Sequence, residues 1–410
     1  MSTTLRQHAH TIVTKAIESA LPEQAVRKTL SDFHPDGRLF LVSVGKAAWI
    51  MANAALDVLS VPITNGIVIT KYGHVVHALP SIQCLEAGHP IPDANGFSAT
   101  QAVLDMTRDL NASDTVLLLL SGGGSALFEK ALIPLEELQE ITKHLLGCGA
   151  SITEINTIRK HLSLVKGGRF AQHCSPAKVY AVILSDVLGD QIDVIASGPT
   201  VPDSSTCKDA AEIMEKYAIS LSAEAAVCLK TETPKALINA QTKIIGSVRQ
   251  LCAAAADTCL ALGYTPILLS DAIDGEAREI GRFLGQILAA NAASGKKIAL
   301  IAGGETVVHL KGNGLGGRNQ ELALAAAAPI SGIQNVCLIS VGSDGTDGPT
   351  DAAGGYVDGN TFSLLHEKGK NYWELLNNND AYHALETVNG LVKIGPTGTN
   401  VNDIVIGLIG

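Results

Sequence analysis

Short apolar runs that stop at glycine, serine, aspartate or lysine recur along the chain and constrain its fold more than any other feature. Examples are LFLVSVGK at 39–46, TVLLLLSGGGS at 115–125 and KVYAVILSD at 178–186. Continuous apolar runs of this length are typical of strands buried on both faces of a sheet. Helical segments such as PLEELQEITKHLLGCG and VRQLCAAAADTCLALG lie between them. This alternation predicts an α/β fold built on an open, mainly parallel sheet.

The length of the chain predicts two domains. A chain of 410 residues exceeds what a single hydrophobic core normally supports. The stretch LKTETPKALIN at 229–239 is polar, contains a proline and ends a helical region. We therefore place the domain boundary there, with one domain over 1–235 and a second over 236–410.

Composition and charge narrow the class of partner. The net charge of −10 argues against nucleic acid or an anionic membrane as the main partner, so an anionic substrate would need a few well-placed cations. The chain has no apolar run of about 18 residues, which a membrane-spanning helix would require. The N-terminal MSTTLRQHAHTIVTKAIESAL is typical of an amphipathic helix and not of a signal peptide. The eight cysteines are scattered without a Cys-x-x-Cys pair, which favours buried thiols in a reducing cytosol over disulfides or a zinc site.

Two strand ends in the first half of the chain carry candidate anion-binding groups. Ligands of open α/β sheets bind beyond the carboxyl ends of the strands. Lys46 follows an apolar run and precedes a helix, where its ammonium can meet an anion, or where it is simply a surface lysine. The three glycines of SGGGS at 121–125 allow a nest of inward-facing N–H groups, or a plain strand-to-helix turn.

Two further segments of this half have polar groups in suggestive positions. In NTIRKHLSLVKGGRFA, helical spacing brings Asn156 and Arg159 near one face, with Lys160 beside them. Such a face fits an acid- or phosphate-binding helix, and also a solvated surface. Asp186 ends the run KVYAVIL and can act as a general base or metal ligand, or close an Asx turn.

The glycine-rich GNGLGG at 312–317 satisfies the Gly-x-Gly-x-x-Gly pattern of dinucleotide-binding proteins. The fit is poor, because the preceding TVVHLK at 306–311 alternates like a half-exposed strand and not like a buried one. The sequence Gly-Lys-Ser/Thr is absent from the chain, so ATP binding would have to occur without a P-loop. Arg318 begins the next helical run and can bind a phosphate or carboxylate through two N–H groups.

Two segments near the C-terminus complete the set of candidates. GSDGTDGPTDAAGG contains more carboxylates than a turn requires, including Asp344 and Asp347, which predicts either a metal-phosphate site or a capped turn. PTGTNVND places Thr399 and Asn400 where they suit ligand positioning and helix capping equally.

Long blocks of the sequence, in order, resemble the glycerate 2-kinase family. They include VGKAAWIMA, AGHPIPDANG, LLSGGGSAL, NTIRKHLSLVKGGRFA, SDVLGDQIDVIASGPTVPD, AGGETVVHLKGNGLGGRNQELALA, SVGSDGTDGPTDAAGGYVD and PTGTNVND. The resemblance covers nearly the whole chain. It implies a Rossmann-like domain over 1–235, a second α/β domain of the MOFRL type over 236–410, and an active site in the cleft between them.

The resemblance also implies an activity. The family phosphorylates D-glycerate at its 2-hydroxyl with ATP, and Mg²⁺ would bridge the nucleotide phosphates. The family's catalytic residues fall on Lys46, Asp186 and Arg318. Asp186 would accept the hydroxyl proton, and the two cations would stabilise the transferred phosphoryl group. Relatives commonly have a second acidic residue at the position of Gln191, so no metal-binding role is expected there.

The remaining predicted site residues form two groups. Those expected to bind substrate or nucleotide are Ser43, Gly45, Ser121, Gly122, Gly123, Gly124, Ser125, Asn156, Arg159, Lys160, Gly303, Gly304, Gly314, Gly316, Gly317, Asn319, Thr399 and Asn400. Those expected to hold a metal are Glu305, Asp344 and Asp347.

The expected ligands are therefore ATP, Mg²⁺ and D-glycerate. We expect a cytoplasmic monomer or homodimer that binds neither nucleic acid nor membrane. Two alternatives stay open at this point. One is an NAD(P)H-dependent reductase of hydroxypyruvate or tartronate semialdehyde, and the other is a non-catalytic protein that binds sugar acids or nucleotides.

Overall fold

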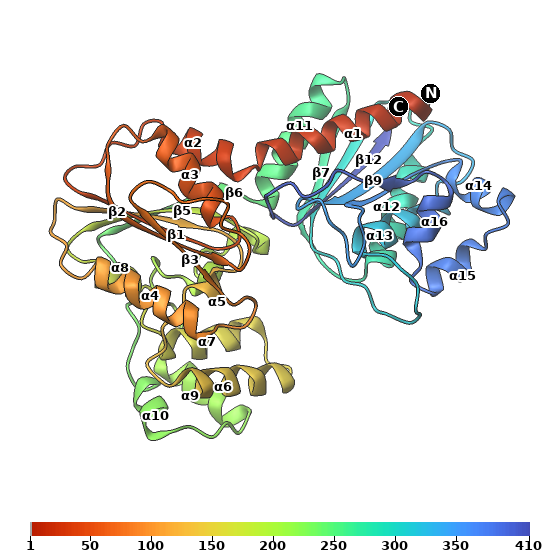
Figure 1. The fold of residues 1–410 in the computed structure, drawn as a ribbon. Helices are drawn as coiled ribbons and strands as arrows, with labels where there is room; N and C mark the ends of the chain where they lie inside the picture. Colours follow the sequence, from red (N-terminus) through yellow and green to blue (C-terminus); the bar gives the residue numbers. More distant parts are fainter. Residues whose placement is uncertain (1) are drawn as a thin grey trace. The chain divides into compact units, whose positions relative to one another are not determined.

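The computed structural model describes residues 2–410, which form two α/β units (Figure 1). The central unit is Pro22–Ile245, and the terminal unit combines residues 2–21 with Gly246–Gly410. The predicted boundary lay after residue 235. The observed division falls later because β6 (Ala240–Gly246) is the last strand of the central sheet. The N-terminal helix belongs to the terminal unit because it packs on α11 and on strands β9 and β12 there.

The central unit is built on a sheet of strand order β3-β2-β1-β4-β5-β6. Its first five strands are β1 (Leu39–Val44), β2 (Ile63–Lys71), β3 (Ile82–Ala87), β4 (Thr115–Leu120) and β5 (Lys178–Leu184). Neighbouring strands from β3 to β5 are parallel, so their carboxyl ends lie at one edge. Every residue of β1 and β4 is buried. The chain reverses its direction of travel across the sheet between β1 and β4, which is where open α/β sheets bind ligands.

Helices cover both faces of the central sheet. Its helices are α2 (Pro22–Leu30), α3 (Ala48–Val58), α4 (Ala94–Met106), α5 (Gly124–Leu127), α6 (Leu135–Gly147), α7 (Ile152–Leu162), α8 (Arg169–His173), α9 (Cys207–Lys216) and α10 (Ala223–Cys228), with short 3-10 turns η1 (Leu188–Asp190) and η2 (Ile195–Ser197). Figure 1 shows α3 on one face and α4 on the other. Helices α6, α7, α9 and α10 share a separate apolar cluster beside the sheet. Capping boxes begin α7 and α9, which fixes where these helices start.

The terminal unit has a mixed sheet of order β11-β10-β9-β12-β8-β7. Its strands are β7 (Thr265–Ile273), β8 (Ile298–Gly304), β9 (Val336–Gly342), β10 (Gly354–Asp358), β11 (Leu391–Val392) and β12 (Asp403–Ile409). The last strand runs antiparallel to both β8 and β9, so Asp403 pairs with Gly304 on one side and Gly342 on the other. The start of β12 therefore lies at the same sheet edge as the ends of β8 and β9.

The helices of the terminal unit are α1 (Ser2–Ser19), α11 (Val248–Ala261), α12 (Ala277–Asn291), α13 (Arg318–Ala327), α14 (Thr361–Glu367), α15 (Tyr372–Asn377) and α16 (Ala381–Thr387). Figure 1 shows α1 and α11 on one face of the sheet and α12 and α13 on the other. The predicted N-terminal helix and the predicted α/β class are confirmed. The half-exposed strand predicted at 306–311 is wrong, because only Val307 pairs there, with Glu276. None of the helices in residues 2–410 combines the length and apolarity needed to cross a membrane.

Candidate functional site

Lys46 is held at the turn between β1 and α3 by the loop that follows β4. Gly45 has φ of 123°, and a Cβ there would lie 2.2 Å from Ser121 Oγ, so the close approach requires glycine. The Lys46 N–H donates to Gly122 O at 2.9 Å, and the Ala47 N–H donates to Ser121 Oγ at 3.0 Å. The two predicted strand ends therefore form one rigid backbone platform.

Lys46, His89, Gly122, Gly123 and Asp186 meet on this platform, and we call them the Lys46 cluster. A Cβ placed on Gly122 would lie 2.2 Å from Asp186 Oδ2 and 3.5 Å from Lys46 Cε. A Cβ placed on Gly123 would lie 2.9 Å from His89 Cδ2 and 3.4 Å from Lys46 Cγ. The bare glycines thus allow an ammonium stem, an imidazole and a carboxylate to approach the same stretch of backbone. Two of the three predicted catalytic residues are brought together here.

His89 is the member of the cluster that residue-level reasoning missed. It is the second residue after β3 and lies within AGHPIPDANG, one of the blocks that carry the family resemblance. Burial lowers the pKa of His89 below its usual 6.5, and the positive charges of Lys46 and Lys71 lower it further. The imidazole is therefore neutral at pH 7 and can donate one hydrogen bond and accept another. A histidine immediately beyond a strand end is the signal that could have identified it.

The segment that follows Asp186 is strained. Asp190, Ala196 and Ser197 have φ of 52°, 50° and 59°. This left-handed region costs a non-glycine residue on the order of 1–2 kcal/mol. The strained turn packs against the SGGGS loop, since a Cβ on Gly124 would lie 2.9 Å from Ala196 Cβ. Strain of this kind is concentrated at functional sites, which agrees with the position of the segment beside the Lys46 cluster.

Buried charges hold the SGGGS loop from behind. Arg159 Nη2 and Lys166 Nζ both donate to Ser125 O, at 2.6 Å and 2.9 Å. Their positive charges face the buried carboxylate of Glu129, with Lys166 Nζ 3.3 Å from Oε2. Burial lowers the pKa of Lys166 to about 8, although Glu129 opposes the shift. Arg159, predicted as a ligand-binding residue, therefore supports the loop by donating to the main-chain carbonyl of Ser125.

The other two predicted residues of α7 also have partners within the central unit. Lys160 Nζ lies 3.1 Å from Asp203 Oδ1 and 3.5 Å from Asp193 Oδ2. Asn156 Oδ1 accepts a hydrogen bond from Ser197 Oγ at 3.0 Å. Both contacts attach α7 to the strained segment after β5. A direct role of Asn156 or Lys160 in ligand binding stays a prediction.

Arg318 lies at the start of α13 in the terminal unit, among carboxylates. Its Nε and Nη2 donate to the two oxygens of Asp403, at 2.6 Å and 3.0 Å. Its Nη1 donates to Glu305 Oε1 at 2.8 Å. The Asp403 side chain is 5% exposed, whereas that of Arg318 is 33% exposed and that of Glu305 is 46% exposed. A buried carboxylate therefore fixes one edge of the guanidinium, and an exposed carboxylate contacts the other.

Asp347 caps the helix that Arg318 begins. Its Oδ1 accepts from Asn319 N at 3.1 Å, and its Oδ2 accepts from Gln320 N at 2.9 Å. Burial raises the pKa of Asp347 to about 6, and these two backbone hydrogen bonds only partly oppose the shift. Asp344, by contrast, closes a turn in which Oδ1 accepts from Thr346 N at 2.9 Å. We call Glu305, Arg318, Asp344, Asp347 and Asp403 the Arg318 cluster.

The three predicted metal ligands do not form a compact set of donor atoms. Across residues 2–410, a different trio has ligand atoms within 4.8 Å of one another, namely His161, Cys207 and Glu232 in the central unit. In the Arg318 cluster, both oxygens of Asp347 already accept backbone N–H groups. Glu305 and Asp344 are thus the more accessible of the three predicted ligands.

The glycines of GNGLGG allow close packing within the protein. The N–H groups of residues 311–315 donate to backbone and side-chain oxygens of residues 378–380. A Cβ on Gly314 would lie 2.5 Å from Asp380 Cβ, and a Cβ on Gly317 would lie 2.3 Å from Asp347 Cγ. These N–H groups are already used by the protein, which leaves little of the phosphate-binding nest that the pattern suggests.

The other predicted binding residues make contacts within their own units. These are hydrogen bonds from Ser43 Oγ to Ala48 O (2.7 Å), from Ser340 Oγ to Asn319 Oδ1 (2.6 Å), from Thr399 Oγ1 to Ala20 O (2.8 Å) and from Asn402 N to Asn400 Oδ1 (3.4 Å). Gly303 and Gly304 make room for α11 and for the backbone of β7. Gly316 lies against Ala381, with 3.4 Å from its Cβ position to the alanine Cβ. Their ligand-binding roles stay predictions.

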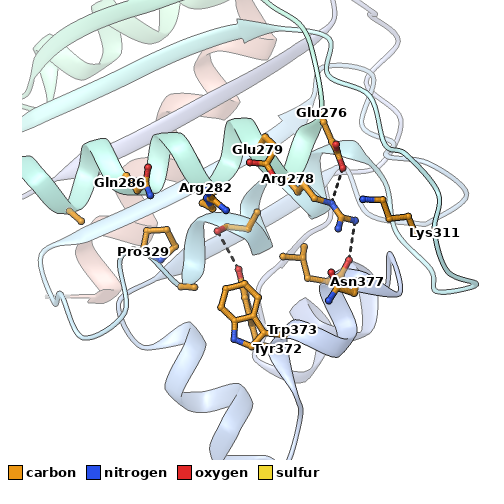
Figure 2. Close-up of a pocket in the computed structure, with 14 residues that line it drawn as sticks. Glu276, Arg278, Glu279, Arg282, Gln286, Lys311, Pro329, Tyr372, Trp373 and Asn377 are labelled. Atoms are coloured by element: carbon orange, nitrogen blue, oxygen red, sulfur yellow. Dashed lines mark hydrogen bonds and ion pairs between the residues drawn. The ribbon is translucent and has the colours of Figure 1, made fainter.

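A pocket of about 560 Å³ lies in another part of the terminal unit, between α12, the end of α13 and α15 (Figure 2). Its walls include Arg278, Arg282 and Trp373. Arg278 is held there by Glu276, with Nε 3.0 Å from the carboxylate Oε1. None of the residues that line this pocket belongs to the predicted site.

Comparisons with known proteins match the full length of the chain. A family model described as a domain of unknown function, DUF4147, matches residues 8–230, and the model of the MOFRL family matches residues 298–403. A D-glycerate 2-kinase of Thermotoga maritima is 52% identical and covers 99% of this chain and 98% of its own. A putative hydroxypyruvate reductase of Agrobacterium vitis is 39% identical and covers 99% of this chain and 94% of its own. The crystal structure of a glycerate kinase of T. maritima aligns over 100% of both chains with a TM-score of 0.97 and 51% identity.

Proposed function

This chain belongs to the glycerate 2-kinase family, and on that premise we propose that it transfers the γ-phosphoryl group of ATP to the 2-hydroxyl of D-glycerate. The observation that carries the proposal is the meeting of Lys46 and Asp186 on Gly122. Lys46 follows β1 at the point where strand order reverses, and Asp186 follows β5, the next strand beyond β4 on the same sheet edge. A cation and a carboxylate at such a point are the groups that phosphoryl transfer to an alcohol needs.

The Lys46 cluster supplies proton removal and charge stabilisation. Phosphoryl transfer requires little covalent chemistry from the protein and depends on positioning and neutralisation of charge. Asp186 accepts the proton of the attacking 2-hydroxyl, while the Lys46 ammonium stabilises the transferred phosphoryl oxygens. The neutral His89 orients the hydroxy acid by a hydrogen bond without adding charge to the site.

The Arg318 cluster supplies a second cation. Asp403 fixes Nε and Nη2 of Arg318, so the guanidinium has one orientation before substrate arrives. The contact between Nη1 and Glu305 is more exposed, and a phosphate group can compete for it. We propose that Arg318 binds a nucleotide phosphate through this edge.

Mg²⁺ fits the accessible oxygens of the Arg318 cluster. The ion usually takes one or two protein carboxylates and completes its shell with water and nucleotide phosphates. Glu305 is nearly half exposed, and Asp344 Oδ1 accepts a single backbone N–H, so these two residues would hold it. Bound there, the ion would neutralise charge on the nucleotide. Asp347, with both oxygens occupied, acts as the cap of α13 in this proposal.

We place the protein in the cytoplasm, with ATP and D-glycerate as its ligands and without nucleic acid as a partner. All eight cysteines are free, as a reducing compartment favours. The net charge of −10 is unfavourable for binding to nucleic acid. Monomer and homodimer are both compatible with this function.

A coupled assay of ADP release tests the proposed activity. The purified chain is incubated with ATP, Mg²⁺ and a small panel of hydroxy acids, and phosphorus NMR identifies which hydroxyl is phosphorylated. We expect ADP release with D-glycerate and a 2-phosphorylated product. A 3-phosphorylated product, or the absence of ADP release with every acid of the panel, would overturn the proposal.

The name of the A. vitis relative makes a reductase the second candidate function. The structure gives it little support, because the N–H groups of 311–315 that a bound dinucleotide would need are donated to residues 378–380. Nicotinamide absorbance with hydroxypyruvate measures this activity directly. Turnover of NADH or NADPH faster than ADP release would favour the reductase over the kinase.

A further inference from the structure

We propose that His161, Cys207 and Glu232 in the central unit form a zinc-binding site. Their ligand atoms lie within 4.8 Å of one another. His161 lies on α7, Cys207 is the first residue of α9, and Glu232 follows α10. The site cannot be recognised from the spacing of residues in the sequence, because its ligands come from three segments that only the fold brings together. We call this trio the His161 cluster.

His161 is the strongest part of the argument. Its side chain is fully buried, and Nδ1 lies 2.9 Å from Thr157 O. A carbonyl oxygen can only accept, so Nδ1 carries the proton and Nε2 has a lone pair. Within residues 2–410, this buried Nε2 has no hydrogen-bond partner. A histidine whose Nδ1 is held by a backbone carbonyl has the tautomer and orientation typical of a metal ligand.

Cys207 and Glu232 are positioned by contacts with each other. The Cys207 N–H donates to Glu232 Oε1 at 3.0 Å, and Lys235 Nζ holds Oε2 at 2.9 Å. Cys207 is half-buried and Glu232 is exposed, so an ion can enter from solvent on their side of the cluster. A water molecule can take a fourth position there.

The set of donors selects the metal. Zinc accepts imidazole nitrogen, thiolate sulfur and carboxylate oxygen, whereas Mg²⁺ and Ca²⁺ prefer oxygen alone. Zinc bonds of about 2.0–2.3 Å place tetrahedral ligand atoms roughly 3.3–3.8 Å apart. Because the three ligand atoms all lie within 4.8 Å of one another, zinc binding would bring any pair closer by no more than about 1.5 Å, and the exposed Glu232 side chain can move by that much.

Two of the three ligands can balance the charge of a divalent ion. A Cys207 thiolate and the Glu232 carboxylate together neutralise a divalent ion. Lys235 and Arg169 are positive groups nearby, and Arg169 interacts electrostatically with Cys207. Burial raises the pKa of the Cys207 thiol, and its hydrogen bond with Glu232 raises it further. Zinc coordination replaces that thiol proton.

The position of the site indicates a structural role. An ion bound there would join the last turn of α7 to the start of α9 and to the segment after α10. Helix α7 also carries Arg159, which donates to Ser125 O of the SGGGS loop. Zinc would therefore stabilise the helices that hold this loop, without touching either substrate.

Cobalt substitution tests the proposal on the full chain. After treatment with a chelator, the protein is titrated with Co²⁺, whose thiolate complexes absorb through ligand-to-metal charge transfer. We expect one Co²⁺ per chain with this band in the wild type and in Cys148→Ser, which removes an exposed thiol outside the trio. Cys207→Ser should lose the band. A wild type without a stoichiometric band, or a band that survives in Cys207→Ser, overturns the site.

A second measurement guards against misfolding of the variant. Zn²⁺ should displace Co²⁺ and raise the Tm of the wild type and of Cys148→Ser. Glu232→Gln alters an exposed side chain, so circular dichroism should show an unchanged fold. Its Zn²⁺ affinity should fall at least about tenfold, the lower end of the loss that even outer-shell substitutions cause. Equal Zn²⁺ affinity in Glu232→Gln and the wild type would contradict the proposal.

Discussion

The Lys46 cluster and the Arg318 cluster bring charged groups together in different ways. In the central unit, Gly122 and Gly123 leave room for Lys46, His89 and Asp186, and parallel strand ends deliver them to one edge. In the terminal unit, a buried carboxylate orients the cation directly, with Asp403 contacting two nitrogens of Arg318. The first cluster therefore depends on the space that two glycines leave, and the second on an ion pair with a buried carboxylate.

This difference predicts different consequences of losing a cation. When Lys46 is truncated, the neighbouring Asp186 carboxylate is only half-buried, so water can still hydrate it. An arginine paired with a buried aspartate cannot be truncated in the same way, because the remaining charge has lost its counter-ion. Catalysis should depend on both cations, whereas stability should depend strongly on only one of them.

The largest expected effect is that of Lys46→Ala on turnover. Removal of one cation that stabilises a transferred phosphoryl group typically costs about 3–4 kcal/mol of barrier, roughly 10²–10³ in kcat. The measurement is kcat from ADP release with D-glycerate. The control is Lys178→Ala, which removes an exposed lysine at the opposite end of strand β5 in the same sheet. A kcat within about threefold of wild type in Lys46→Ala would remove this residue from the proposed mechanism.

The second prediction separates the two cations by stability. Arg318→Ala should lose kcat as Lys46→Ala does, and should also lose about 3 kcal/mol of unfolding free energy, the lower end for breaking a buried pair. We take the lower end because a third of the Arg318 side chain is exposed. Urea unfolding of the two variants measures the difference. Equal unfolding free energies of Lys46→Ala and Arg318→Ala would mean that the two cations contribute equally to stability, contrary to this prediction.

A third prediction concerns the pH dependence of stability, through Asp347. Its pKa is about 6 in the folded protein and 3.8 in its reference state, so the folded state binds more protons between these values. The contribution of Asp347 to the unfolding free energy of the wild type should therefore fall by about 2–3 kcal/mol as the pH rises from about 4 to about 6. It should not fall further above that range. Asp347→Asn removes the titration and can still cap the helix.

Urea unfolding of the wild type and Asp347→Asn at several pH values tests this expectation. The stability of the variant relative to the wild type should increase as the pH rises from about 4 to about 6. A relative stability that falls over this interval would mean that the Asp347 carboxylate is favoured by its helix-capping hydrogen bonds more than it is disfavoured by burial.

The sequence predicted the central cluster better than the terminal one for a topological reason. In a parallel sheet every strand ends at the same edge, so Lys46 and Asp186 could be placed together before any strand order was known. In the terminal sheet, Asp403 reaches Arg318 because β12 runs antiparallel between β8 and β9. That register is set by long-range pairing, and nothing local to PTGTNVND reveals it.

The roles of the two glycine-rich motifs also could not be told apart from the sequence. SGGGS and GNGLGG have similar composition, and both predicted phosphate-binding backbone. The structure shows that Gly122 borders Lys46 and Asp186, whereas Gly314 and Gly317 accept the close approach of Asp380 and Asp347. A glycine indicates that another group comes close to the backbone, and only the fold shows whether that group is a charged side chain at a strand end or another packed segment of the protein.

The smallest expected effect tests whether empty space is what the Lys46 cluster requires. In Gly122→Ala the new methyl group would lie 2.2 Å from Asp186 Oδ2, so the carboxylate must move. A displaced base should lower kcat about tenfold, roughly 1.4 kcal/mol of barrier, with little change in stability. The matched control is Gly147→Ala at the end of α6, where a Cβ meets nothing within 4 Å. A wild-type kcat in Gly122→Ala would show that turnover does not depend on the position of the Asp186 carboxylate. The general base would then be sought among residues that the methyl group does not touch, beginning with His89.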